Sequence, residues 1–148
     1  MYKRATIMIA CLLFAVAAGR IMIQAQIPYR ISDKEVEKIL KRTKNDSNKF
    51  RKSLDSALDR SSLNGTNRED DINAFVKDFD KETDRLYDRF KDHKSVSGDV
   101  ETVLERASRI DRFMQHHQFR NDKAQRNWSA VRADLEQLAQ AYNVTWNW

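Results

Sequence analysis

The stretch Ile72–Phe90, INAFVKDFDKETDRLYDRF, decides the fold of this chain. Its inward-facing positions recur in alternating steps of four and three, an average spacing close to 3.5 residues. Such spacing places these side chains on one face of an α-helix and is typical of coiled-coil-like packing. The stretch therefore predicts a long amphipathic helix whose buried positions are Ile72, Val76, Phe79, Thr83, Leu86 and Phe90.

The same spacing continues before and after this stretch, in runs from Val36, from Val100 and from Ala124. Glycine and proline, the main breakers of regular structure, are scarce: the chain has one proline and three glycines. Short connections between helices force antiparallel neighbours, so the predicted fold is all-α, an up-down bundle of four helices. The expected helices span about 33–63, 67–93, 99–117 and 122–142, within one domain over 26–148, and an extended aromatic tail covers 143–148.

The first two helices form a coiled-coil-like hairpin when the chain is reflected about Gly65. Residues 30–52 hold nine bases and four acids, and residues 53–92 hold seven bases and eleven acids. The basic start of the first helix then lies beside the acidic end of the second, which favours this pairing. The reflection places Leu54 opposite Val76, Ser47 opposite Thr83, and Leu40 opposite Phe90.

The first 25 residues have the pattern of a secretory signal peptide. Lys3 and Arg4 precede an uncharged apolar run over 5–19, which is short of the roughly 20 residues that a membrane-spanning helix needs. Small residues allow cleavage after Ala17, Ala18 or Ala25. We expect an exported protein, periplasmic or secreted. The alternative is an uncleaved membrane anchor, with the helices as its ectodomain.

Charge and cysteine content exclude several classes of function. Three of the 27 basic residues lie in residues 1–25, which hold no acid, so the remaining chain has 24 Lys and Arg against 22 Asp and Glu. So small an excess gives no reason to expect nucleic acid as a partner. The one cysteine, Cys11, lies inside the apolar run, so a cleaved chain has no disulfide, thiolate nucleophile, cysteine-based zinc site or covalent haem attachment.

No pattern of catalytic or metal-binding residues stands out. The histidines (His93, His116 and His117) lack the spacing of a metal site, because adjacent helical residues point about 100° apart. Four acids spaced four apart, from Asp80 to Asp92, run beside a basic column from Lys77 to Arg89. We interpret these columns as a solvated face with weak ion pairs. The expectation is no enzyme activity, no catalytic residues, no metal and no cofactor.

Two features are candidate contacts for a protein partner. The tip of the first hairpin carries Leu58 and Leu63. The tail carries Trp146 and Trp148, in a segment whose period-two alternation suggests an extended strand with one apolar edge. These tryptophans either anchor the tail by covering residues 29, 31 and 36 at the start of the first helix, or are exposed for a membrane interface or a partner.

Four stretches of the chain (50–59, 69–79, 106–114 and 128–148, with its Trp-x-Trp ending) resemble short exported bacterial helical proteins that have no defined activity. The resemblance implies export and helicity and supplies no activity. The leading expectation is a non-enzymatic interaction or structural protein of the cell envelope, with an unknown protein partner. The alternatives are a periplasmic chaperone-like stress protein that binds unfolded clients, a membrane-anchored ectodomain, and a homodimer that buries the hairpin's apolar face.

Overall fold

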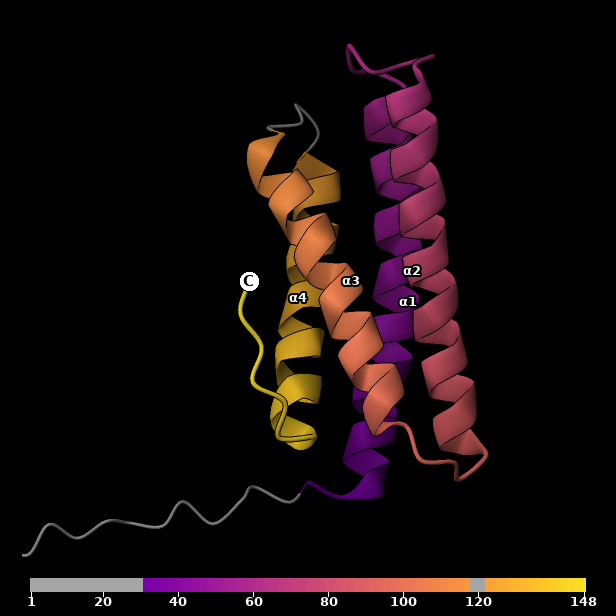
Figure 1. Cartoon of the computed structure of the whole chain (residues 1–148), viewed down its shortest axis with the longest axis vertical. Coiled ribbons are helices and arrows are strands. Elements are labelled where there is room, and N and C mark those ends of the chain that lie inside the picture. Colours follow the sequence, from indigo (N-terminus) through magenta and orange to yellow (C-terminus); the bar gives the residue numbers. More distant parts are fainter. Residues whose placement is uncertain (1–30, 118–121) are drawn as a thin grey trace, which may run out of the picture.

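The computed structural model describes residues 31–117 and 122–148, which form four helices (Figure 1). Over these residues the structure contains no strand, and the prediction of an all-α antiparallel bundle is confirmed. The predicted signal peptide, with Cys11, lies outside the described residues. No helix in the described part is long and apolar enough to cross a membrane. The helices are α1 (Asp33–Leu58), α2 (Asn67–Lys91), α3 (Ser97–His116) and α4 (Asp122–Ala141).

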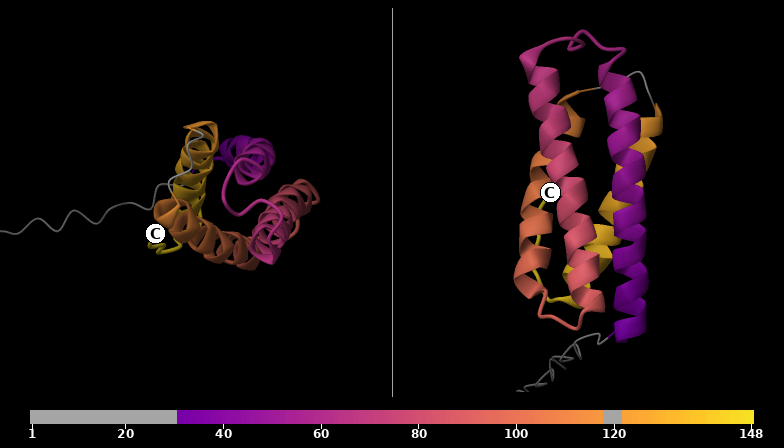
Figure 2. Two further views of the ribbon diagram at one scale, coloured as in Figure 1. Left: turned by 90° about the horizontal axis from the view of Figure 1, so that it is seen from above. Right: turned by 90° about the vertical axis from the view of Figure 1, so that its right-hand side faces the viewer.

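The helices surround the core in chain order, as the view along the bundle shows (Figure 2, left). α1 makes the most extensive contacts, with α4 on one side and α2 on the other, whereas α3 packs less extensively against α2 and α4. α1 and α2 have 26 and 25 residues, against 20 each in α3 and α4. The α1–α2 hairpin consequently extends beyond the other pair at its turn end (Figure 1).

The core is centred on three aromatic rings contributed by three helices. The Trp128 ring centroid lies 4.9 Å from that of Phe50 and 6.1 Å from that of Phe79, and all three side chains are buried. Burial of such large apolar side chains stabilises the fold by about 1.5–3 kcal/mol each. The central packing therefore fixes α1, α2 and α4 relative to one another.

The predicted register of the first hairpin is confirmed by its polar positions. The Thr83 hydroxyl donates a hydrogen bond of 3.1 Å to the Ser47 hydroxyl across the α1–α2 interface. Both residues are buried. A buried hydroxyl must find a partner, so the two polar interruptions hold the helices at this register.

The first helix ends at Leu58, five residues before the predicted boundary at 63. The residues that follow form turns, in which the Asn64 side-chain amide donates to the Asp59 carbonyl at 2.7 Å. Gly65 adopts φ +74°, a left-handed conformation that costs glycine little. Local side-chain-to-backbone bonds of this kind compete with the helix and end it early.

Side chains cap two of the three helix N-termini whose caps the structure describes. Ser32 and Glu35 form a capping box at α1, and the Thr66 side chain caps α2. Asp99, a residue type that is common at the N-cap position, does not cap α3. This helix begins at Ser97 with no side-chain cap, and the Asp99 carboxylate instead lies 2.8 Å from Arg89 Nε on α2.

Candidate functional site

The column of acids on α2 forms the solvated face that its spacing suggested only in part, because Asp88 and Asp92 are exposed whereas Asp80 is buried. Asp80 is only 8% exposed and accepts hydrogen bonds from the Ser47 hydroxyl at 2.6 Å and from Arg51 Nε at 2.8 Å, both on α1. Farther along the column, Lys44 Nζ lies 3.5 Å from Asp84. Asp80, Asp84 and Asp88 meet bases of α1, whereas Asp92 pairs with Lys94 after the end of α2. Three of the four acids therefore take part in the pairing of α1 with α2.

A second buried acid, Asp111 on α3, was not singled out by the sequence. It is 1% exposed and accepts a 2.7 Å hydrogen bond from the Trp128 indole and a 2.5 Å bond from the Gln115 amide. Arg132 Nε lies 3.4 Å away and supplies the opposite charge. In the sequence, the burial of Asp111 is indicated only by its position next to Ile110, at the edge of an apolar stripe. With both oxygens occupied, the carboxylate is a structural element.

The C-terminal tail lies against α3 and α4, with its tryptophans partly buried. The Trp146 indole donates to the Ser108 hydroxyl at 2.7 Å, and the Trp148 indole donates to the Glu136 carboxylate at 2.9 Å. The Trp148 ring also meets Trp128 edge-on at 6.3 Å and lies 4.2 Å from the Arg132 guanidinium carbon. Both tryptophans are therefore tied to the bundle rather than extended into solvent.

The tryptophans of the tail contact α3 and α4 and do not cover residues 31 and 36 of the chain, which corrects one expectation, and residue 29 lies outside the described residues. Asn143 takes φ +55°, and the Val144 amide donates to the Ala139 carbonyl at 2.9 Å, which closes α4 with a tight reversal. The chain then runs back alongside α4 (Figure 1). The predicted alternation holds, since Val144, Trp146 and Trp148 face inward and the residues between them are exposed.

The two leucines at the hairpin tip have different surroundings. Leu58 is fully buried and packs in the core, so its side chain offers no surface to a partner. Leu63 is half-buried against the core. The partner-contact role of the tip thus rests on Leu63 alone. No group of three His, Cys, Asp or Glu side chains within the described ranges could hold a metal ion.

An apolar groove lies between α2 and α3, in the half of the interface nearer the α1–α2 turn. Its volume is about 340 Å³, and its floor is made by Val76 and Ile110, both 2% exposed. The half-buried side chains of Ile72, Phe75 and Phe113 form its walls. The sequence placed Ile72 in the core, and Phe75 and Phe113 were not singled out. Charged residues at the rim are Arg68, Asp71 and Arg109.

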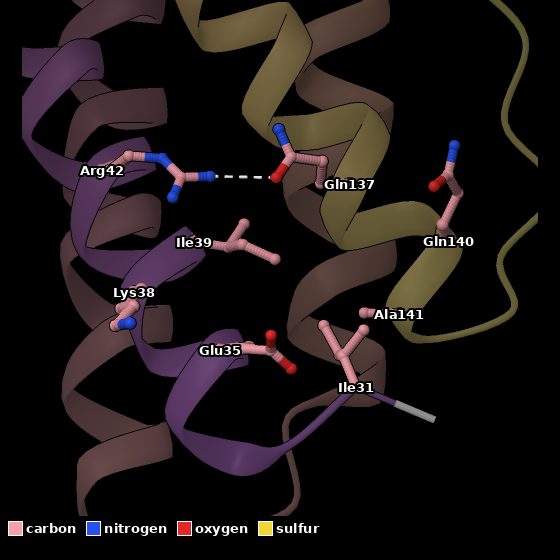
Figure 3. A pocket seen from close by; sticks show the side chains of 8 residues that line it. All are labelled: Ile31, Glu35, Lys38, Ile39, Arg42, Gln137, Gln140 and Ala141. Atoms are coloured by element: carbon pink, nitrogen blue, oxygen red, sulfur yellow. Dashed lines mark hydrogen bonds between the residues drawn. The ribbon is translucent and has the colours of Figure 1, made fainter. Parts of the chain in front are cut away.

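A hollow between α1 and α4 is less apolar than the α2–α3 groove (Figure 3). It has a volume of about 280 Å³ and is lined by apolar residues such as Ile31 and Ile39 together with polar ones. Arg42 bridges it, donating to Gln137 at 3.0 Å and to the Asp134 carboxylate at 2.9 Å. These bonds join α1 to α4 across the hollow. We therefore interpret the hollow as part of the α1–α4 interface rather than as a binding site.

Asp134 gives this contact a pH dependence. Burial raises the pKa of its carboxyl above the ordinary 3.8, against the opposing effect of Arg42. The folded state therefore retains the proton to higher pH than the unfolded state does. The stabilising contribution of this carboxyl is complete below pH 3.8 and is lost as the pH rises through the pKa of the folded state.

The variant Asp134→Asn tests this pH dependence, because its side chain does not titrate. In urea unfolding at a series of pH values, the stability of the native protein relative to this variant should fall as the pH rises, and a rise would mean that the Arg42 ion pair dominates.

No family model matches the chain, and neither a curated protein nor a solved structure matches it. The fold and its surface define a four-helix bundle with one strongly apolar groove among the hollows described here. The predicted absence of a named family with a known activity is consistent with this result. Function is therefore argued from the geometry of the groove.

Proposed function

We propose that the chain is a non-enzymatic interaction protein of the cell envelope, exported by its N-terminal segment. The observation that supports a binding role is the α2–α3 groove, in which Phe75 and Phe113 remain half-exposed beside a fully packed core. Apolar side chains that line a hollow with a charged rim are typical of contact sites. α3 is the least extensively packed helix, which leaves this side of the bundle unclosed.

The occupant that fits is one or two large apolar side chains from a partner protein. The lining on α2 runs from Arg68 to Val76, about two helical turns, which is too short for a long segment. Arg68, Asp71 and Arg109 stand at its rim, and Arg109 forms an ion pair of 2.8 Å with Glu105 on its own helix. Contacts of this size act as hot spots, in which a single buried anchor supplies much of the binding energy.

A photoreactive phenylalanine analogue at position 75 tests this proposal inside the producing cell. We expect one defined cross-linked species, absent when the analogue replaces Phe90, the half-buried phenylalanine at the other end of α2. A cross-linked product with twice the mass of the chain would show that the partner is a second copy of this chain. A broad distribution of products, with suppression of client aggregation near equimolar ratio, would favour the chaperone alternative.

The variant Phe75→Ser should weaken the captured complex by about 2–4 kcal/mol, because it removes the ring against which the partner's apolar side chain packs. Phe90→Ser is the matched control, because it makes the same change on the same helix outside the groove. Both variants should lower stability by a similar amount, about 1–2 kcal/mol for a half-buried ring. Affinity measured by calorimetry with the identified partner separates them, and equal losses of affinity in both variants would count against the groove.

Export is tested separately, by intact mass and cell fractionation of the full-length product in a Gram-negative host. A soluble envelope species that begins at Gln26, or near Ala18, would support the proposed compartment. A membrane-bound species that retains Met1 would make the helices an ectodomain, with its partners among membrane complexes. A cytoplasmic product would contradict the envelope proposal.

A further inference from the structure

The turn between α1 and α2 contains a dipeptide that is chemically labile. Asn64 is followed by Gly65, and no other asparagine in the sequence precedes a glycine. In such a pair the backbone nitrogen of the glycine can attack the side-chain amide carbon of the asparagine, because glycine has no Cβ to hinder the approach. Both residues are exposed, and a Cβ built on Gly65 would meet no atom beyond its chain neighbours within 4 Å. Solvent and space for ring closure are therefore available at this turn.

The reaction of such a pair is the formation of a succinimide ring, followed by its hydrolysis. A bond forms between the Gly65 nitrogen and the Asn64 Cγ, the Cγ–Nδ2 bond breaks, and the side-chain nitrogen leaves as ammonia with the proton of the Gly65 N–H. Water then opens the ring at either carbonyl, which yields aspartate or isoaspartate. The net change replaces an amide with a carboxylate and adds one negative charge.

Two hydrogen bonds oppose this reaction in the folded turn. The Gly65 N–H donates to a carboxylate oxygen of Glu69 at 2.6 Å, and Glu69 is only 6% exposed. The nitrogen must lose its proton to attack, and a carboxylate at this distance disfavours a second negative charge. A carboxylate is also far too weak a base to remove an amide proton itself. The second bond, from the Asn64 side-chain amide to the Asp59 carbonyl at 2.7 Å, holds the leaving nitrogen in place.

We propose that Asn64–Gly65 is a modification site whose conversion to aspartate or isoaspartate is restrained by Glu69 in the folded chain. The conversion changes the turn, because a carboxylate at position 64 has no proton to donate to the Asp59 carbonyl. It also places a negative charge near the C-terminal end of α1, where the helix dipole disfavours one. The bond that helps to end α1 is then lost, close to the half-buried Leu63 at the same tip. The inference is independent of the α2–α3 groove.

Peptide mapping by mass spectrometry, after incubation at mildly alkaline pH, measures the conversion at each asparagine. The chain unfolded in guanidinium chloride should convert at Asn64 before any other asparagine. In native buffer we expect conversion at Asn64 to be at least about tenfold slower, because attack then requires local opening of the turn. Glu69→Ala removes the acceptor of the Gly65 N–H, so it should speed conversion in the folded chain by at least about fivefold. Asp70→Ala, which removes an exposed acid from the same first turn of α2, is the matched control and should leave the rate within about twofold.

The comparison of the folded with the unfolded native chain does not depend on either variant, and circular dichroism checks that both variants fold. Equal rates of conversion at Asn64 in the folded and the unfolded chain would overturn the proposal, since the turn would then restrain nothing. Equal acceleration by Glu69→Ala and Asp70→Ala would contradict the role given to Glu69. Faster conversion of another asparagine in the unfolded chain would contradict the assignment of the site.

Discussion

Replacing Trp128 with alanine is expected to lower the free energy of unfolding by about 3–5 kcal/mol, the range for large aromatic side chains removed from a core. Trp128 is 2% exposed and contacts the rings of Phe50 and Phe79. The substitution also removes the indole N–H that donates to Asp111 at 2.7 Å. Because domains of this kind are stable by about 5–15 kcal/mol in total, the variant should be marginally folded. Urea unfolding followed by circular dichroism measures the change.

Conservative variants separate the two causes of this loss. Trp128→Phe retains most of the ring and removes the N–H, so it should cost about 1.5–3 kcal/mol, the range for a hydrogen bond to a charged group. Asp111→Asn removes the charge that this bond stabilises. In the double variant the losses should therefore be less than additive, by at least about 0.5 kcal/mol. Strict additivity would show that Trp128 acts through packing alone.

The fold was predictable because its determinants are local and periodic. The stripe from Ile72 to Phe90 specifies a helix and its buried face, and Gly65 marks the turn about which the first two stripes pair. The Ser47–Thr83 bond shows that this pairing holds to the residue. Periodicity could not show where α1 ends, since Asn64 and Gly65 form turn contacts that compete with a helix whose apolar pattern continues.

The site residues were less predictable, because they depend on the packing of helices that are distant in sequence. Asp80 has the same spacing as its solvated neighbours, and only the position of Arg51 on α1 shows that it is buried. Phe75 and Phe113 lie off the inward stripes, and they line one groove because α3 packs only loosely against α2.

Deleting Trp146–Trp148 is expected to lower the free energy of unfolding by about 2–4 kcal/mol and the melting temperature by about 10 °C. The deletion removes two half-buried indoles and their hydrogen bonds to Ser108 and Glu136. It also removes the cation–π contact with Arg132, worth about 0.5–1 kcal/mol at a partly exposed site. Thermal unfolding followed by circular dichroism measures the effect.

The exposed residues of the same tail provide the control for this deletion. Thr145→Ala/Asn147→Ala changes the side chains that face solvent and leaves both indoles, so its melting temperature should stay within about 2 °C of the native value. A large loss in the deletion alone shows that the tail closes the α3–α4 side of the bundle. An unchanged melting temperature would mean that the tryptophans contribute nothing to the fold, and the partner-contact role predicted for Trp146 and Trp148 would then be the reason for their presence.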